Sequence, residues 1–315
     1  MNRREDQAAA TQGESGKTAE GDDAVAALNG AARAHLSSGR LLEAQLCCQQ
    51  ALALDGDRAD TLHLMGLLCI HTKQLDHAVE WLSRAIRQEP KTLYLTTLGT
   101  ALLQQGRGAE ALNAFEKAIE LEPGNGGLWR NLGLALAELR RNDEAILSFQ
   151  HALKLEPGLW DAANKAAILL HQAARFEDAL VYFNLCDELE PNNMQTVGLR
   201  SDTLQKLQRY EEALADIERV QLHDATNADA CNQIGNCLAA LRRYEEALFW
   251  YDRAFALGDK HALRNKAIAL EQLGRLDQAM AAYRQAIAMD PDDGGAEWNL
   301  AMLQLLTGDF EAGWA

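Results

Sequence analysis

The chain has 315 residues, of which 48% are hydrophobic, 24% are charged and only five are prolines. Such a composition allows most of the chain to form helices around a buried core. The formal net charge of -16 disfavours nucleic-acid binding, because affinity for a phosphate backbone depends largely on Lys and Arg.

The amino terminus carries no sign of secretion or of a membrane anchor. Residues 1–10 are polar, and no later apolar run approaches the length of a membrane span. We therefore expect a cytoplasmic protein that does not enter a membrane. The six cysteines are expected to be reduced thiols, because disulfides are rare outside oxidising compartments.

Residues 1–24 are predicted to form a disordered polar tail, since they have no apolar period that could offset the entropy of ordering. The segment Gly13–Thr18 partly matches a phosphate-binding loop. The full motif needs a glycine at position 11, where this chain has Thr11, and a preceding strand. We therefore assign no phosphate site there.

From residue 25 a short pattern recurs, in which an alanine follows a polar or acidic residue and opens an amphipathic run. The alanines are Ala44, Ala78, Ala111, Ala145, Ala179, Ala213, Ala247 and Ala279, at intervals of 34, 33, 34, 34, 34, 34 and 32 residues. A period near 34 with helical spacing in both halves predicts two helices per unit.

Glycine and proline mark where these helices are expected to end. Gly39, Gly106 and Gly274 lie between the two helices of a unit, where a positive φ angle ends the first helix. Twelve residues after the repeating alanine a proline ends the second helix in five units. These are Pro90, Pro123, Pro157, Pro191 and Pro291.

Small residues recur where the two helices should cross. Twelve residues before the alanine stand Ala32, Gly66, Gly99, Gly133, Ala167, Ser201, Gly235 and Ala267. Large residues four positions after the alanine, such as Phe149 and Tyr251, are expected to fill the gap between neighbouring units. Because the residues at each crossing are small, the backbones of the two helices can approach closely there.

The fourth unit resembles the tetratricopeptide-repeat family. It carries nearly the whole family signature, as Trp129, Leu132, Gly133, Leu136, Ala145, Phe149, Ala152 and Pro157. The resemblance covers residues 25–315 and implies an all-α, right-handed superhelical solenoid of antiparallel helix pairs, with eight full repeats and part of a ninth. The repeats are expected to start near residues 25, 59, 92, 126, 160, 194, 228, 260 and 294.

Repeat six departs most from this pattern. Arg200, Ser201, Val220 and Ala225 stand where leucine, glycine, alanine and proline are usual in the family. We therefore expect looser packing or an altered turn in that repeat.

No set of catalytic or metal-binding residues emerges from the spacing. The eight histidines form no His-Glu-x-x-His pair, and acidic pairs such as Glu211–Glu212 and Glu245–Glu246 fall at helix starts, where they favour the helix dipole. We therefore expect no enzyme activity, no metal and no cofactor.

The family resemblance implies that extended peptides lie in an inner groove lined by the first helix of each repeat. The expected groove residues are His63, Thr96, Thr100, Arg130, Asn131, Asn164, Asn232, Asn236, Arg264, Asn265 and Asn299. Asparagine recurs at the sixth position of three repeats, and an amide can both donate to and accept from a peptide backbone. The chain is therefore predicted to be a scaffold for a protein or peptide partner.

The last residues favour an alternative. The run from Leu305 to Trp314 resembles the last repeat of bacterial proteins in which such repeats precede a glycosyltransferase-like domain. The chain would then be the substrate-recognition part of a longer glycosyltransferase. An apolar terminal repeat without a polar cap also suggests self-association.

Overall fold

The computed structural model describes residues 21–292 and 294–314, and every regular element in these ranges is a helix. The helices follow one another in pairs, in agreement with the solenoid expected from the period. The Gly13–Thr18 segment and most of the predicted tail lie outside the described residues. Residues 21–24, which we assigned to that tail, are already helical.

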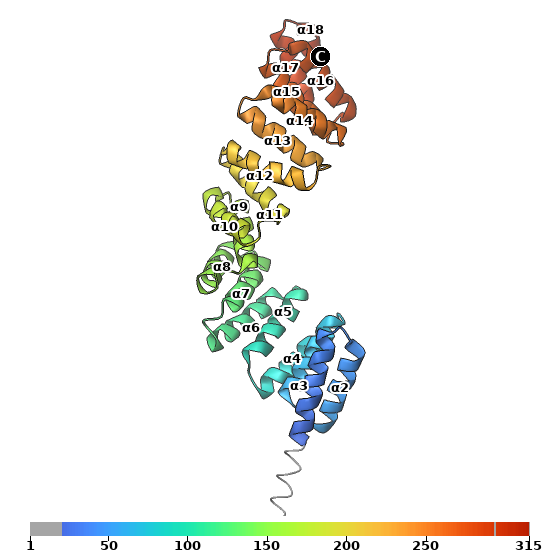
Figure 1. Ribbon diagram of the computed structural model, residues 1–315, viewed down its shortest axis with the longest axis vertical. Coiled ribbons are helices and arrows are strands. Elements are labelled where there is room, and N and C mark those ends of the chain that lie inside the picture. The colour runs from blue at the N-terminus through green and yellow to red at the C-terminus, as the bar shows by residue number, and fades with distance from the viewer. Residues whose placement is uncertain (1–20, 293, 315) are drawn as a thin grey trace, which may run out of the picture. The chain divides into compact units, whose positions relative to one another are not determined.

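Two compact units divide the chain, residues 1–162 and 163–315, and each is described by itself. In the first unit a helix over residues 21–37 comes before α2, and three further helix pairs and the start of α9 follow (Figure 1). Its helices are α2 (Leu41–Leu54), α3 (Ala59–His71), α4 (Leu75–Gln88), α5 (Thr92–Gln104), α6 (Gly108–Leu121), α7 (Gly126–Glu138), α8 (Asn142–Leu155) and the beginning of α9 (Trp160–Gln172).

The second unit has the same alternation up to the last described residues. Its further helices are α10 (Phe176–Leu189), α11 (Met194–Lys206), α12 (Tyr210–His223), α13 (Ala228–Ala240), α14 (Tyr244–Ala256), α15 (His261–Gln272), α16 (Leu276–Met289), α17 (Gly294–Leu306) and the short α18 (Phe310–Gly313). The helices of a pair run antiparallel, because only about three residues join them.

The turn inside each repeat has the left-handed backbone that the glycines predicted. Gly39, Gly106 and Gly274 have φ angles of 71° to 73°. The equivalent position in the other five full repeats has the same conformation without glycine, at Lys73, Arg140, Ala174, Gln208 and Arg242, with φ between 57° and 61°. Since this region costs an L-residue roughly 1 kcal/mol, the packing of the two helices imposes the turn whichever residue is present.

The crossing of the two helices is as close as the small residues predicted. An ideal Cβ built on Gly133 would lie 2.6 Å from the ring of Phe149, and one on Gly235 would lie 2.5 Å from the ring of Tyr251. Each large side chain therefore packs over the glycine of its own repeat, a contact that we had not assigned to it. Phe149 is fully buried there.

Arginines just before the second helices bind many of the acidic side chains on the surface. Arg209 Nε lies 2.7 Å from Glu212, and Arg243 Nε lies 2.7 Å from Glu246, both three residues further on. Arg275 of the following repeat binds Glu245. The acidic pairs that we assigned to helix starts thus contact arginines. Because these ion pairs are exposed to water and screened by salt, they contribute little to stability.

Candidate functional site

The first helices of consecutive repeats form one surface of each unit, which we call the first-helix face. It comprises α3, α5 and α7 in the first unit and α11, α13, α15 and α17 in the second. The second helices, α4, α6 and α8 or α10, α12, α14 and α16, form the second-helix face. All eleven residues expected in the groove lie on first helices of their repeats.

In the first unit, three of the expected groove residues line one hollow of about 370 Å³ between α5 and α7. They are Thr96, Arg130 and Asn131. The Arg130 guanidinium donates to the side-chain oxygen of Asn131 at 3.0 Å and lies 3.4 Å from Asp161 Oδ2. Because that ion pair is long and partly exposed, it neutralises Arg130 only weakly. The hollow can therefore accept a peptide carbonyl, whereas the carboxylate of Glu122, which also lines it, disfavours a second anion.

In the second unit, three asparagines form a cluster across α13 and α15. Asn265 Nδ2 donates to Asn232 Oδ1 at 3.0 Å and to Asn236 Oδ1 at 3.2 Å. The hydroxyl of Tyr251 also donates to Asn236 Oδ1, at 3.0 Å. All three amides are partly exposed. Asn232 Nδ2, Asn236 Nδ2 and Asn265 Oδ1 take no part in these bonds, so two donor groups and one acceptor group remain for a ligand.

The remaining expected residues are more scattered. Thr100 is exposed and donates its hydroxyl to the carbonyl of Thr96. Asn164 Oδ1 is buried without a hydrogen-bond partner among the described residues. Asn299 lines a smaller hollow of about 180 Å³ with Glu271 and Leu306. Arg264 is half-buried on α15.

His63 does not lie on an open surface, contrary to our expectation. It is only 4% exposed, its Nε2 is 3.0 Å from Thr97 Oγ1, and its ring centroid is 4.8 Å from that of Tyr94. Because its contacts come from the next repeat, His63 contributes to packing between repeats and is removed from the proposed site.

The buried imidazole makes stability depend on pH. Burial lowers the pKa of His63 to about 4 and outweighs the opposing charge of Asp60. The unfolded chain, with a His pKa near 6.5, therefore binds a proton before the folded chain does, and stability falls as the pH drops from about 6.5 to 4. We expect His63→Gln to flatten the pH dependence of the melting temperature in that window. The exposed His77 on α4 provides the control His77→Gln, and equal slopes for both variants would contradict the assignment.

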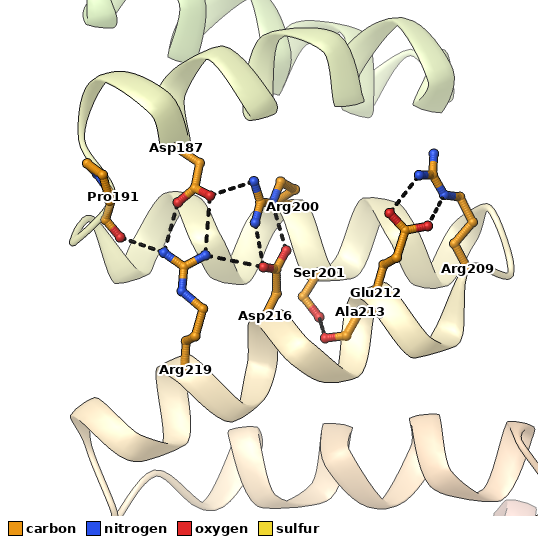
Figure 2. A network of polar contacts seen from close by, with 9 residues as sticks. All are labelled: Asp187, Pro191, Arg200, Ser201, Arg209, Glu212, Ala213, Asp216 and Arg219. Carbon is orange, nitrogen blue, oxygen red and sulfur yellow. Dashed lines mark hydrogen bonds and ion pairs between the residues drawn. The ribbon is translucent and has the colours of Figure 1, made fainter.

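A network of charged residues between repeats five and six takes the place of an apolar contact. Figure 2 shows Arg200 between two carboxylates, with its Nε 2.7 Å from Asp216 Oδ2 and its Nη1 2.7 Å from Asp187 Oδ2. Arg219 donates to Asp187 at 2.9 Å and to the carbonyl of Pro191 at 2.6 Å. In repeat six, for which we expected looser packing or an altered turn, the polar groups thus satisfy one another.

The contacts of this network shift the pKa values of its own members. Burial tends to raise the pKa of Asp187, but hydrogen bonds from Arg219 and the charge of Arg200 more than offset it and hold this pKa below its usual value. The hydrogen bond to Asp216 raises the pKa of Arg200 despite burial. Asp187 and Arg200 are therefore both charged at neutral pH, and neither is poised for proton transfer.

Models of the tetratricopeptide repeat match residues 29–91, 96–159, 228–261 and 262–293, which is more than half of the chain. The chain belongs to the tetratricopeptide-repeat family. The paired helices and the small residues at their crossings are the physical basis of this assignment. The tetratricopeptide-repeat fold is that of a protein-interaction scaffold.

Solved structures of tetratricopeptide-repeat proteins agree with the fold. The pilF protein of Pseudomonas aeruginosa is 20% identical, with a TM-score of 0.59 over 65% of this chain and 94% of that one. YrrB, a TPR protein with an unusual peptide-binding site, is 21% identical, with a TM-score of 0.52 over 62% and 98%. A tetratricopeptide-repeat protein of Parabacteroides merdae is 18% identical, with a TM-score of 0.53 over 79% and 99%. No curated protein matches the chain significantly.

The described part of this tetratricopeptide-repeat chain shows neither a metal-binding cluster nor a membrane span. In residues 21–292 and 294–314, no three His, Cys, Asp or Glu side chains are arranged to hold a metal ion. No helix in the same ranges is both long and apolar enough to span a bilayer. The six cysteines are free thiols, and five of them are buried.

Several polar contacts on the first helices were missed by sequence reasoning. His171 binds Asp202 at 3.2 Å and Thr203 at 2.9 Å, and the Tyr94 hydroxyl donates to Asp60 at 2.6 Å. Each pair is separated by 31 to 34 residues, which is close to one repeat period. Comparing each polar residue with the residue one period later would have found them.

Proposed function

We propose that this chain holds an extended segment of a partner protein along its first-helix face. The observation that carries the proposal is the asparagine cluster of Asn232, Asn236 and Asn265. Its amides are partly exposed, hold one another at 3.0 to 3.2 Å and keep a donor and an acceptor available. A peptide backbone offers both groups at every residue, so an amide pair can bind it without demanding one side-chain charge.

The hollow between α5 and α7 supports the same function in the first unit. Arg130 provides a cation beside Thr96 and Asn131, and the apolar side chains of Leu93 and Leu128 also line the hollow. A free peptide carbonyl would be stabilised there by a charge-assisted hydrogen bond from Arg130.

The asparagine cluster can be tested with selected peptides. A phage-displayed library of random 12-residue peptides would be panned against the full chain, and the binders measured by fluorescence anisotropy. Each lost amide hydrogen bond costs about 1 kcal/mol, so Asn232→Ala with Asn265→Ala is expected to weaken binding roughly tenfold or more. These two changes leave the bond between Tyr251 and Asn236 in place.

A matched control removes an amide from the other face of the same unit. Asn184 lies exposed on α10, and Asn184→Ala is expected to leave the affinity of the selected peptides unchanged. The proposal fails if the double variant, with an unchanged circular-dichroism spectrum, binds these peptides as tightly as the wild type does.

The glycosyltransferase alternative rests on the motif between Leu305 and Trp314 and on the asparagine positions of the first helices. It predicts several hundred additional α/β residues encoded after Ala315, which the downstream coding sequence would reveal. Under either hypothesis the repeats themselves should not bind a sugar nucleotide, and heat released on titrating one into this chain would contradict both.

A further inference from the structure

A further hollow lies on the second-helix face of the first unit, away from the proposed peptide site. It has a volume of about 560 Å³ and is lined by α4 and α6, with α5 beneath them. Leu95, Leu98 and Leu102 of α5 form its floor, and Ile86 of α4 extends it. These leucines line this hollow, whereas Thr92 and Thr96 of the same helix line the hollow between α5 and α7. We call this hollow the α4–α6 groove.

The rim of the α4–α6 groove carries cations on both sides. Arg87 at the end of α4 and Lys117 on α6 are exposed, and neither forms an ion pair with any described residue. The carboxylate of Glu110, which also lines the groove, is already bound by Arg107 at 2.7 Å. The groove is thus locally basic although the whole chain has a net charge of -16. An occupant with carboxylates on either side of an apolar stripe would complement it.

The second unit has a hollow at the equivalent place, and charged side chains of the chain itself partly fill it. Counted from the repeating alanine, Leu98 corresponds to Arg200, Ala114 to Asp216, Ile86 to Asp187, and Lys117 to Arg219. These four charged residues form the network of Figure 2. The remaining hollow there has a volume of about 240 Å³. At the equivalent positions the α4–α6 groove has three apolar side chains and one cation, Lys117, in place of the ion pairs.

We propose that the α4–α6 groove binds an acidic amphipathic helix of a partner protein. Leucine-like side chains of that helix would contact Leu95, Leu98 and Leu102, and its flanking carboxylates would face Arg87 and Lys117. The groove walls are helices of 14 residues each, so they offer about 21 Å of length, enough for roughly four turns of a third helix. Seating an apolar helix face between two helices is a known mode of peptide recognition.

A designed peptide provides the probe for this site. The peptide would be a fluorescein-labelled 15-residue helix with leucines spaced three and four residues apart and glutamates beside them. A second peptide would carry lysine in place of each glutamate. We expect the acidic peptide to bind the full chain at least tenfold more tightly than the basic one, with an affinity that falls as the salt concentration rises. Equal affinities, or no binding of the acidic peptide, would overturn the proposal.

Two variants locate the binding. Leu98→Arg with Ala114→Asp copies the Arg200–Asp216 pair into the groove and is expected to weaken binding of the acidic peptide at least tenfold. Arg87→Glu with Lys117→Glu keeps the apolar floor and is expected to reverse the preference between the two peptides. If the first variant fails to fold, this surface variant alone decides the question. Undiminished binding to a folded variant of either kind would refute the site.

Controls separate this site from other places and modes of binding. Lys154 occupies in α8 the position that Arg87 has in α4, and Lys154→Glu is expected to leave peptide binding unchanged. The variant with Asn232→Ala and Asn265→Ala should also bind the acidic peptide normally, so the proposed function and this inference can fail independently. If dodecanoate displaces the peptides and the acidic and basic peptides bind equally well, the groove binds a small amphiphile instead. If the chain is in a monomer–dimer equilibrium that the Leu98→Arg variant abolishes, the groove binds a second copy of the chain instead.

Discussion

Replacing Asp216 by alanine is expected to destabilise the second unit by about 3 to 5 kcal/mol, because the substitution leaves a buried cation with incomplete pairing. The side chains of Arg200 and Asp216 are only 15% and 5% exposed, so water cannot replace the lost carboxylate. Arg200 would keep one carboxylate, Asp187, which Arg219 already binds. The desolvation of the Arg200 guanidinium would then no longer be offset.

The double variant Arg200→Leu with Asp216→Ala is the control, because it restores the residues that Leu98 and Ala114 provide in repeat three. Replacing a buried ion pair by apolar groups is often neutral or stabilising, so most of the lost stability should return. Urea denaturation and amide hydrogen exchange in α11 and α12 would measure both variants, since repeat arrays need not unfold in one step. If Asp216→Ala and the double variant are equally unstable, the ion pairs do not replace an apolar contact at this position.

The second large effect is expected from Gly133→Leu, which should cost about 3 kcal/mol by overpacking. Even a Cβ at this position would lie 2.6 to 2.9 Å from three ring atoms of Phe149, which is fully buried and cannot move into solvent. The two helices of repeat four would therefore have to separate. A lower melting temperature, with amide exchange accelerated first in α7 and α8, would be the measured result.

Gly198 provides the matched control for this prediction. It also lies inside a first helix, α11, but nothing lies within 4 Å of a Cβ built on it. Gly198→Leu should be neutral or slightly stabilising, because leucine favours a helix over glycine by up to about 1 kcal/mol. A similar loss of stability in both variants would show that the crossing at Gly133 is not specifically tight.

The repeating features of the fold could be predicted because each of them recurs from repeat to repeat. The period, the glycine turns at Gly39 and Gly106 and the small residues at the crossings follow from local sequence and from packing that recurs in every unit. The left-handed turns at Lys73 and Arg140 could not be predicted from residue preference, because tertiary packing overrides the preference there.

The individual features were harder to predict. The family pattern placed His63 in a groove, but its burial depends on Tyr94 and Thr97 of the next repeat, about one period away. The network around Arg200 joins residues 13 and 16 positions away, so it cannot be recognised from local periodicity. Asn232 and Asn265 are 33 positions apart, which is close to one period, so a comparison of residues one period apart would have found this pair.

The polar pairs that link successive first helices limit how the modules can be rearranged. Asp60 binds Tyr94, and His63 binds Thr97, so repeat two presents groups that only repeat three complements. Deleting, duplicating or swapping a repeat would keep the helix pairs, but these polar groups would face residues that cannot form the same hydrogen bonds. These polar pairs therefore help to fix the order of the repeats. A consensus repeat inserted between repeats two and three would need partners for Asp60 and His63 on one side and for Tyr94 and Thr97 on the other.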